Sequence, residues 1–226
     1  MKLKSFAKVN LYLKVKKKKG ILHKINSVFT IVEDLYDEIT IVESNKSFDT
    51  ITCNIKELEK NNFIFQVLNI LREEHVITKY YKIDIKKNIP LGSGMGGGSS
   101  NAVTVIKYFS NSKRILKRVA KEIGSDCYYF ISGYHTAKVK GYGDKIKEIS
   151  SNKKIYKSDL IFTNINCNTS EVYKKFDDIK AWKNKYENNM LEIPAIKLYP
   201  NLADYREYGQ MTGSGSTFIK KTSLRM

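Results

Sequence analysis

Residues 92–100 hold five of the chain's thirteen glycines and end in two serines. An alternating apolar run that ends at Ile89 precedes this segment, and a helix-like run at 101–109 follows it. Glycine permits positive φ angles and close approach to the backbone N–H groups. A helix that begins after such a loop directs unpaired N–H donors and a positive dipole end toward it. The segment therefore predicts an anion site suited to phosphate.

Three other interpretations of this segment fit less well. No Gly-Lys-Ser/Thr closes it, as a Walker A loop requires. A dinucleotide fingerprint lies in the first turn of a βαβ unit, whereas this segment follows several predicted strands. A flexible linker would be longer and would not connect a strand to a helix.

The composition of the 226 residues is that of a globular protein, with 42% hydrophobic residues. No apolar run approaches the roughly 20 residues that a membrane span needs. The three cysteines, Cys53, Cys127 and Cys167, are widely spaced, which favours a reducing cytoplasm over a disulfide framework. The three histidines are equally scattered, so we expect no protein cage for a transition metal.

The net charge of +17 would suit nucleic acid, a membrane surface or a polyanionic small substrate. The lysines are spread along the whole chain, and no basic helix or nucleic-acid-binding module is present. A solvated, lysine-rich surface is the favoured explanation, and we expect neither nucleic acid nor a membrane as partner.

The periodicity of the sequence predicts a mixture of strands and helices without strict βαβ alternation, which is typical of the α+β class. Strands are expected at 3–15, 25–32, 38–42, 80–85, 155–163 and 217–220, with a further candidate at 48–55 and a polar turn at 33–37. Helices are expected at 63–76, 101–109, 113–123, 171–178 and 195–205. The polar stretch at 150–154 suggests two domains, 1–150 and 151–226.

Three smaller features carry candidate chemistry, and each has a simpler alternative. Lys8 and Asn10 share one face of the first strand, although such a pair is usually ordinary surface. Asp126 precedes the apolar run 127–131, where an acid serves either as a helix N-cap or as a partly desolvated carboxylate that handles a proton. A second small-residue turn at 211–217 would alone be a hairpin or bulge.

Taken together, these segments resemble the GHMP kinase superfamily, which includes galactokinase, homoserine kinase and mevalonate kinase. The resemblance rests on Ala-Lys-Val-Asn-Leu at 7–11, Pro-Leu-Gly-Ser-Gly-Met-Gly-Gly-Gly-Ser-Ser-Asn-Ala at 90–102 and Met-Thr-Gly-Ser-Gly at 211–215, in that order. It implies a two-domain α+β fold with an N-terminal ribosomal S5-like nucleotide-binding domain (1–150) and a C-terminal ferredoxin-like substrate domain (151–226).

Within the superfamily, the segments at 124–130 and 141–144 resemble those of kinases that act on 4-diphosphocytidyl-2-C-methyl-D-erythritol in the non-mevalonate isoprenoid pathway. The resemblance implies transfer of the γ-phosphoryl of ATP, with Mg²⁺, to the 2-hydroxyl of this cytidine diphosphate alcohol. Asp126 matches the catalytic aspartate and Lys8 matches its partner lysine. An ammonium nearby favours the ionised carboxylate, which can accept or orient the hydroxyl proton.

The same resemblance assigns the binding residues. The ATP-binding positions are Asn62, Pro90, Gly92, Gly94, Met95, Gly96, Gly97, Gly98, Ser99 and Ser100. The substrate-binding positions are Asn10, Leu22, His23, Phe29, Thr169, Tyr173 and Gly213, with His23 matching the residue that hydrogen-bonds cytosine. Leu22 is a departure, because the family usually has a tyrosine there that packs on the base. Without the family pattern, Asn62 would be a helix N-cap, His23 a polar loop residue and Tyr173 a half-buried aromatic residue.

Two alternatives stay open at this point. A kinase of the same superfamily could act on another small alcohol, such as homoserine or mevalonate, although His23 and the segment 126–130 argue against this. A non-enzymatic, basic nucleic-acid-binding protein of S5-like fold would explain the charge but not the glycine-rich loop. We expect a cytoplasmic protein that is a monomer or a weak dimer.

Overall fold

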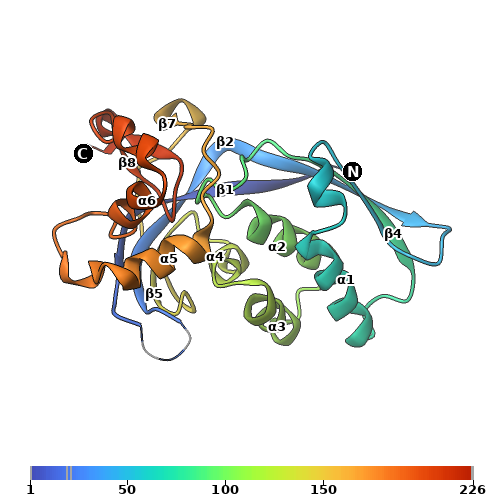
Figure 1. The fold of residues 1–226 in the computed structure, drawn as a ribbon. Coiled ribbons are helices and arrows are strands. Elements are labelled where there is room, and N and C mark those ends of the chain that lie inside the picture. The colour runs from blue at the N-terminus through green and yellow to red at the C-terminus, as the bar shows by residue number, and fades with distance from the viewer. Residues whose placement is uncertain (1, 19, 21, 225–226) are drawn as a thin grey trace. The chain divides into compact units, whose positions relative to one another are not determined.

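The computed structural model describes residues 2–18, 20 and 22–224 (Figure 1). Contacts within the chain divide it into two compact units. The first comprises Met1–Ala7, Leu35–Ile89 and Gly96–Gly133, and the second comprises Lys8–Asp34, Pro90–Met95 and Tyr134–Met226. The predicted domains 1–150 and 151–226 are defined by their nucleotide-binding and substrate-binding roles, not by contacts within the chain. That division therefore stays a prediction.

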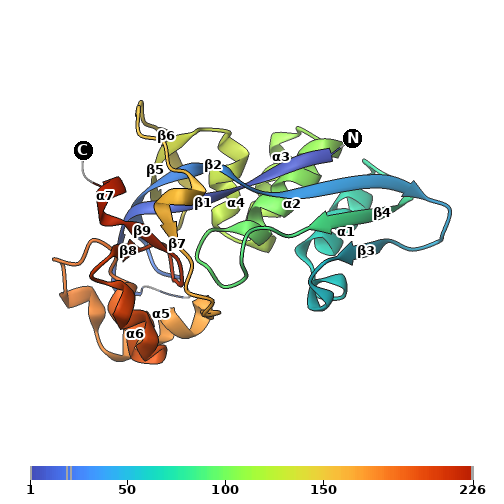
Figure 2. The same ribbon diagram turned by 90° about the horizontal axis from the view of Figure 1, so that it is seen from above.

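The sheet of the first unit is formed by segments distant in sequence. The second half of β2 (Ile25–Ser44) pairs antiparallel with β4 (Tyr80–Lys86), and β4 pairs in parallel with β3 (Thr50–Cys53). Figure 2 shows β3 and β4 side by side, and β1 (Lys2–Val15) pairs with β2. The register sets Ile39 opposite Ile85 and Ile85 opposite Cys53, so that this row buries apolar side chains on one face.

Helices cover the apolar face of this sheet. They are α1 (Phe63–Glu73), α2 (Gly97–Phe109), α3 (Lys113–Ile123) and α4 (Asp126–Ser132). The expected apolar stripe of the first helix is confirmed, because Ile64, Val67, Leu68 and Leu71 are all buried in one cluster with the strands. The predicted α3 is confirmed at both ends, and α2 begins four residues earlier than the sequence pattern indicated, at Gly97.

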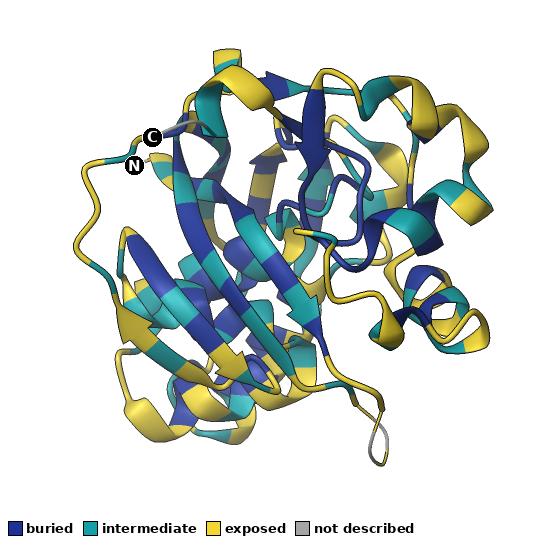
Figure 3. Ribbon diagram, turned by 90° about the vertical axis from the view of Figure 1, so that its left-hand side faces the viewer, coloured by how far each residue is buried: buried dark blue, intermediate teal, exposed yellow. Residues whose placement is uncertain are grey.

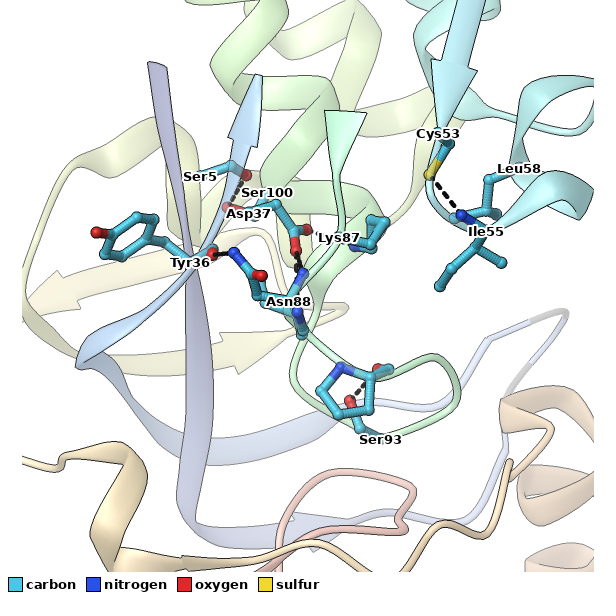
Figure 4. A network of polar contacts seen from close by, with 12 residues as sticks. Ser5, Tyr36, Asp37, Cys53, Ile55, Leu58, Lys87, Asn88, Ser93 and Ser100 are labelled. Carbon is cyan, nitrogen blue, oxygen red and sulfur yellow. Dashed lines mark hydrogen bonds and ion pairs between the residues drawn. The ribbon is translucent and has the colours of Figure 1, made fainter. Parts of the chain in front are cut away.

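The polar turn predicted at 33–37 is wrong, because β2 continues through it as one 20-residue strand. Asp37 does not face solvent but is fully buried and paired with Lys87. Its second carboxylate oxygen accepts hydrogen bonds from the backbone N–H groups of Asn88 (2.8 Å) and Ile89 (2.9 Å). Figure 4 shows Asp37 beside Lys87 and Asn88, so a side chain that resembles a turn residue instead joins β2 to the end of β4.

The second unit contains the first half of β2, which pairs antiparallel with β5 (Thr136–Gly141), and β5 pairs with β6 (Lys145–Glu148). A separate three-stranded sheet has the order β7 (Leu160–Ile161), β9 (Phe218–Lys220) and β8 (Gly209–Met211). The helices of this unit are α5 (Thr169–Asp178), α6 (Glu192–Leu198) and α7 (Lys221–Leu224). Along most of β2, buried residues alternate with half-buried ones, as period-two patterning requires, and Figure 3 colours the strands by this burial.

Two predicted elements of this unit are shorter than expected. The strand expected at 155–163 is reduced to the two residues of β7, preceded by a 3-10 turn at Lys157–Asp159. The helix expected at 195–205 is α6 followed by a 3-10 helix at Pro200–Tyr205. Pro200 explains the break, because proline supplies no N–H group and disfavours a helical conformation at the residue before it.

No helix among the described residues has the length and apolar character needed to cross a membrane.

We predict that Lys87→Met destabilises the protein by about 3–5 kcal/mol, because it leaves the buried Asp37 carboxylate without its cation. The double variant Asp37→Asn/Lys87→Met removes both charges and keeps an oxygen for the N–H groups of Asn88 and Ile89, so it should regain part of this loss. The urea midpoint at constant m-value measures both. Lys2→Met, which breaks an exposed pair with Glu38, is the control and should change the midpoint little. Equal shifts for Lys87→Met and Lys2→Met would contradict the assignment.

Candidate active site

The first turn of α2 begins directly after the glycine-rich loop. Gly96 precedes it in the left-handed conformation (φ 68°), and the N–H of Ser100 bonds back to the Gly96 carbonyl at 2.9 Å. Helix geometry leaves the earlier N–H groups, at Gly97, Gly98 and Ser99, without intrahelical partners. This turn is tied to β1 by a buried hydrogen bond from Ser5 Oγ to Ser100 Oγ (2.7 Å), which Figure 4 shows.

Two of these glycines have close neighbours. A methyl group added to Gly98 would lie 3.2 Å from the ring of Phe63, the first residue of α1. One added to Gly97 would lie 3.1 Å from Nζ of Lys87, so the Lys87 ammonium lies beside the start of α2. Asn62 is the N-cap of α1, since its Oδ1 accepts from the N–H of Ile64 at 3.1 Å. The N-cap interpretation of Asn62 is therefore confirmed, and its nucleotide contact stays a prediction.

Residues 90–95 belong to the second unit, where they contact the second glycine turn. Gly94 has φ +73°, and a methyl group added to it would lie 2.4 Å from the Thr212 carbonyl oxygen. A methyl group on Gly213 would lie 2.6 Å from the Gly94 carbonyl oxygen. The two glycine-rich segments, far apart in sequence, therefore touch backbone to backbone. Ser93 Oγ closes the loop by donating to the Pro90 carbonyl at 2.6 Å.

Lys8 lies against this pair of turns. Its Nζ donates to the Gly94 carbonyl (2.9 Å) and to Asn10 Oδ1 (2.8 Å), and it stands 4.5 Å above the centre of the Phe29 ring. Its backbone N–H donates to the Met95 carbonyl at 3.1 Å. Lys8 is only 3% exposed and Asn10 only 2%, so the interpretation of this pair as ordinary surface is wrong.

The structure thus brings together several predicted site residues in the second unit. Asn10 is further fixed by its backbone N–H, which donates to Thr212 Oγ1 at 2.6 Å. Asn189, which the sequence did not single out, holds the second turn by donating to the carbonyls of Met211 (2.7 Å) and Gly213 (2.8 Å). No local pattern distinguishes an asparagine that binds a distant turn.

Asp126 is the first residue of α4, and Ser125 holds the N-cap position, so the N-cap interpretation of Asp126 is wrong. A carboxylate in a first helical turn is favoured by the helix dipole. The next residue, Cys127, is buried, and its Sγ lies 3.8 Å from the Ser99 carbonyl of α2. The C-terminal carbonyls of α4, at Phe130 and Ile131, accept from Lys107 Nζ at 3.0 and 2.9 Å.

Both ends of α4 are thus held against α2, which places Asp126 next to the anion-binding turn of the same unit. Burial raises the pKa of the Cys127 thiol to about 12 and lowers the pKa of Lys107. The thiol therefore stays protonated at neutral pH and is no nucleophile. Lys8 lies in the other unit, so its pairing with Asp126 stays a prediction.

The predicted base-binding residues also lie in the second unit. Two residues of α5, Asp177 and Tyr173, contact His23. The Nε2 atom of His23 is 2.8 Å from Asp177 Oδ1, and the centres of the His23 and Tyr173 rings are 5.0 Å apart. Thr169, at the start of α5, shares a 2.8 Å hydrogen bond with Ser214 of the second glycine turn. Leu22 is 57% exposed and lies just before His23.

These features, a glycine-rich turn that opens α2 in the first unit and a second turn that packs on Gly94 beside the buried Lys8 in the second, are those of a GHMP kinase. The sequence model described as GHMP kinases N terminal domain matches residues 62–134. A 4-diphosphocytidyl-2-C-methyl-D-erythritol kinase from Ureaplasma parvum is 35% identical over 253 aligned residues, covering 97% of this chain and 95% of the relative. One from Sulfurimonas denitrificans is 30% identical and covers 97% of each chain. The chain therefore belongs to the 4-diphosphocytidyl-2-C-methyl-D-erythritol kinase family.

Solved structures show the same fold. A crystal structure of 4-(cytidine 5'-diphospho)-2C-methyl-D-erythritol kinase matches with a TM-score of 0.75 and 22% identity, covering 97% of this chain and 89% of that chain. Homoserine kinase from Cytophaga hutchinsonii matches with a TM-score of 0.60 and 15% identity, covering 99% and 87%. These likenesses confirm the predicted α+β GHMP kinase fold.

We predict that Gly94→Ala weakens ATP binding and destabilises the protein more than Gly133→Ala does. The two glycines have nearly equal φ, +73° and +71°, but a methyl group at Gly133 would meet nothing within 4 Å. Gly133→Ala should cost about 1–2 kcal/mol for the left-handed backbone alone. Gly94→Ala should add an overpacking cost of about 1–3 kcal/mol. Denaturation and nucleotide titration measure both effects, and equal losses for the two variants would refute the packing argument.

Proposed function

We propose that the chain transfers the γ-phosphoryl group of ATP to the 2-hydroxyl of 4-diphosphocytidyl-2-C-methyl-D-erythritol, a step of the non-mevalonate isoprenoid pathway. The observation that carries the proposal is the buried Lys8 ammonium on the Gly94 carbonyl, where the two glycine turns touch. Membership of the kinase family supports the same reaction. We also propose that the protein acts in the cytoplasm as a monomer or weak dimer.

ATP would enter as its Mg²⁺ complex, which is the phosphoryl donor. The N–H groups of Gly97, Gly98 and Ser99 and the dipole of α2 suit the triphosphate, and the segment from Gly94 to Ser100 would wrap it. Phosphoryl transfer depends mainly on positioning and electrostatic stabilisation. A preformed turn of backbone donors supplies both without side-chain reorganisation.

The acceptor would lie near Asp126 and Lys8. The 2-hydroxyl oxygen forms the new bond to the γ-phosphorus while the bond from that phosphorus to the β–γ bridging oxygen breaks, and ADP leaves. Asp126 accepts or orients the hydroxyl proton, and Lys8 stabilises negative charge near the acceptor oxygen. Asn10 and Phe29, which contact Lys8, would line the methylerythritol end of the substrate.

The cytidine end would lie at His23, with Tyr173, Thr169 and Leu22 beside it. A carboxylate only accepts hydrogen bonds, so Asp177 requires a proton on Nε2 of His23. In the neutral imidazole this leaves Nδ1 as an acceptor. An acceptor matches the 4-amino group of cytosine and mismatches the 4-oxo group of uracil.

To test the reaction, we would measure ADP release from Mg-ATP with 4-diphosphocytidyl-2-C-methyl-D-erythritol, homoserine or mevalonate in separate assays. We expect turnover only with the cytidyl alcohol. Asp126→Asn should lower kcat by about 100-fold or more, because it removes a positioned carboxylate. The exposed Asp178→Asn carries the same charge change and should keep full activity. Turnover with another alcohol, or full activity of Asp126→Asn, would contradict the proposal.

A second test concerns base selectivity. Asp177→Asn lets Nε2 of His23 either donate or accept, because an amide offers both groups. We expect the preference in kcat/KM for the cytidine over the uridine form of the substrate to fall about tenfold, which corresponds to about 1.4 kcal/mol. Asp178→Asn, one residue further on α5, is the matched control. An unchanged preference in Asp177→Asn would show that Asp177 does not set the selectivity.

A further inference from the structure

A chain of hydrogen bonds inside the second unit leads from the Lys8 ammonium to the backbone of β1. Lys8 Nζ donates to Asn10 Oδ1 at 2.8 Å, and Asn10 Nδ2 donates to Ser27 Oγ at 3.0 Å. Ser27 Oγ then donates to the Tyr12 carbonyl oxygen. Ser27 lies on β2, directly opposite Val139 of β5.

The chemistry of the two ends fixes the direction of every bond in this chain. An ammonium only donates and a carbonyl oxygen only accepts. The Asn10 amide must therefore turn its oxygen toward Lys8 and its NH₂ group toward Ser27, and the Ser27 hydroxyl must give its proton to Tyr12. The orientation of the amide follows from its partners.

Solvent cannot replace any member of this chain. Ser27 is 0% exposed, and Lys8 and Asn10 are nearly as deeply buried. The backbone N–H of Asn10 is itself bonded to Thr212 Oγ1, so the Asn10 backbone is held independently of its side chain. Only the torsion of the amide depends on Ser27.

We propose that Ser27 is a positioning residue for phosphoryl transfer, which orients the Asn10 amide so that the Lys8 ammonium stays on Asn10 Oδ1 and the Gly94 carbonyl. The proposal rests on the function proposed for Lys8. Without the Ser27 hydroxyl, Asn10 Nδ2 loses its acceptor and the amide is no longer held. A buried NH₂ group without an acceptor is costly, so the amide rotates toward another acceptor and carries its oxygen away from the Lys8 ammonium, which then shifts.

The test compares Ser27→Ala with Ser27→Thr, which keeps a hydroxyl at the same position. Ser27→Ala should lower kcat with the cytidyl alcohol by about 10- to 100-fold, the effect of a small displacement of a catalytic group, while KM for ATP stays within about twofold. Ser27→Thr should restore most of kcat. Thr30→Val is the control, because it removes a buried hydroxyl of the same strand, bonded to Thr136 at 2.9 Å, and should leave kcat unchanged.

Two further variants separate this inference from the proposed function. In an Asn10→Ala background, Ser27→Ala should cause no further loss of kcat, because Ser27 acts through Asn10. Lys8→Met alone reports on the proposed role of Lys8, and an unchanged kcat in that variant would refute that role. The inference is overturned if Ser27→Ala keeps full kcat, if Ser27→Thr loses as much as Ser27→Ala, or if Ser27→Ala still lowers kcat without Asn10.

Discussion

The buried ammonium of Lys8 is the constraint on which the candidate site depends. A charge taken from water must be hydrogen-bonded within the protein, or the cost of desolvation is not offset. Here Asn10 and the Gly94 carbonyl provide the oxygens. The Gly94 carbonyl occupies its position because Gly94 has a positive φ and no side chain, so the second glycine turn packs directly on it. The glycines of both turns thus serve the lysine as well as any bound phosphate.

The first unit also buries a lysine ammonium, but pairs it with a carboxylate. Asp37 lies within β2 and Lys87 directly follows β4, and both side chains are buried in direct contact. The other carboxylate oxygen of Asp37 accepts hydrogen bonds from the backbone N–H groups of Asn88 and Ile89, just before the glycine-rich loop. A buried pair of this kind is weak support for overall stability, but it is costly to break on one side. Lys87 Nζ would lie 3.1 Å from a methyl group added to Gly97, so the pair borders the first turn of α2.

The sequence predicted those elements whose signal is local. The apolar stripes of α1 and α3, the glycine loop before α2 and the resemblance to GHMP kinases all depend on neighbouring residues or on short motifs. Two of the errors share one cause, because each involves a polar residue whose partner is distant in the chain. Asp37 resembled a turn residue because Lys87 is 50 positions away, and Lys8 resembled a surface residue because Gly94 is 86 positions away. Ser27 and Asn189 gave no signal for the same reason.

The two buried lysines differ in the oxygens of their own unit that hold them. The Lys87 ammonium lies on the Asp37 carboxylate, so the charges of the two groups cancel and the pair serves the architecture of its unit. The hydrogen bonds of Lys8 to Asn10 and Gly94 end on neutral oxygens, which hold the position of the ammonium. An aspartate at position 10 would hold the lysine more strongly but would compete with a phosphate for it. A neutral amide therefore suits a lysine that stabilises charge on a substrate, but its buried NH₂ group needs an acceptor of its own. Ser27 fills that place, because its hydroxyl accepts from the amide and donates to Tyr12.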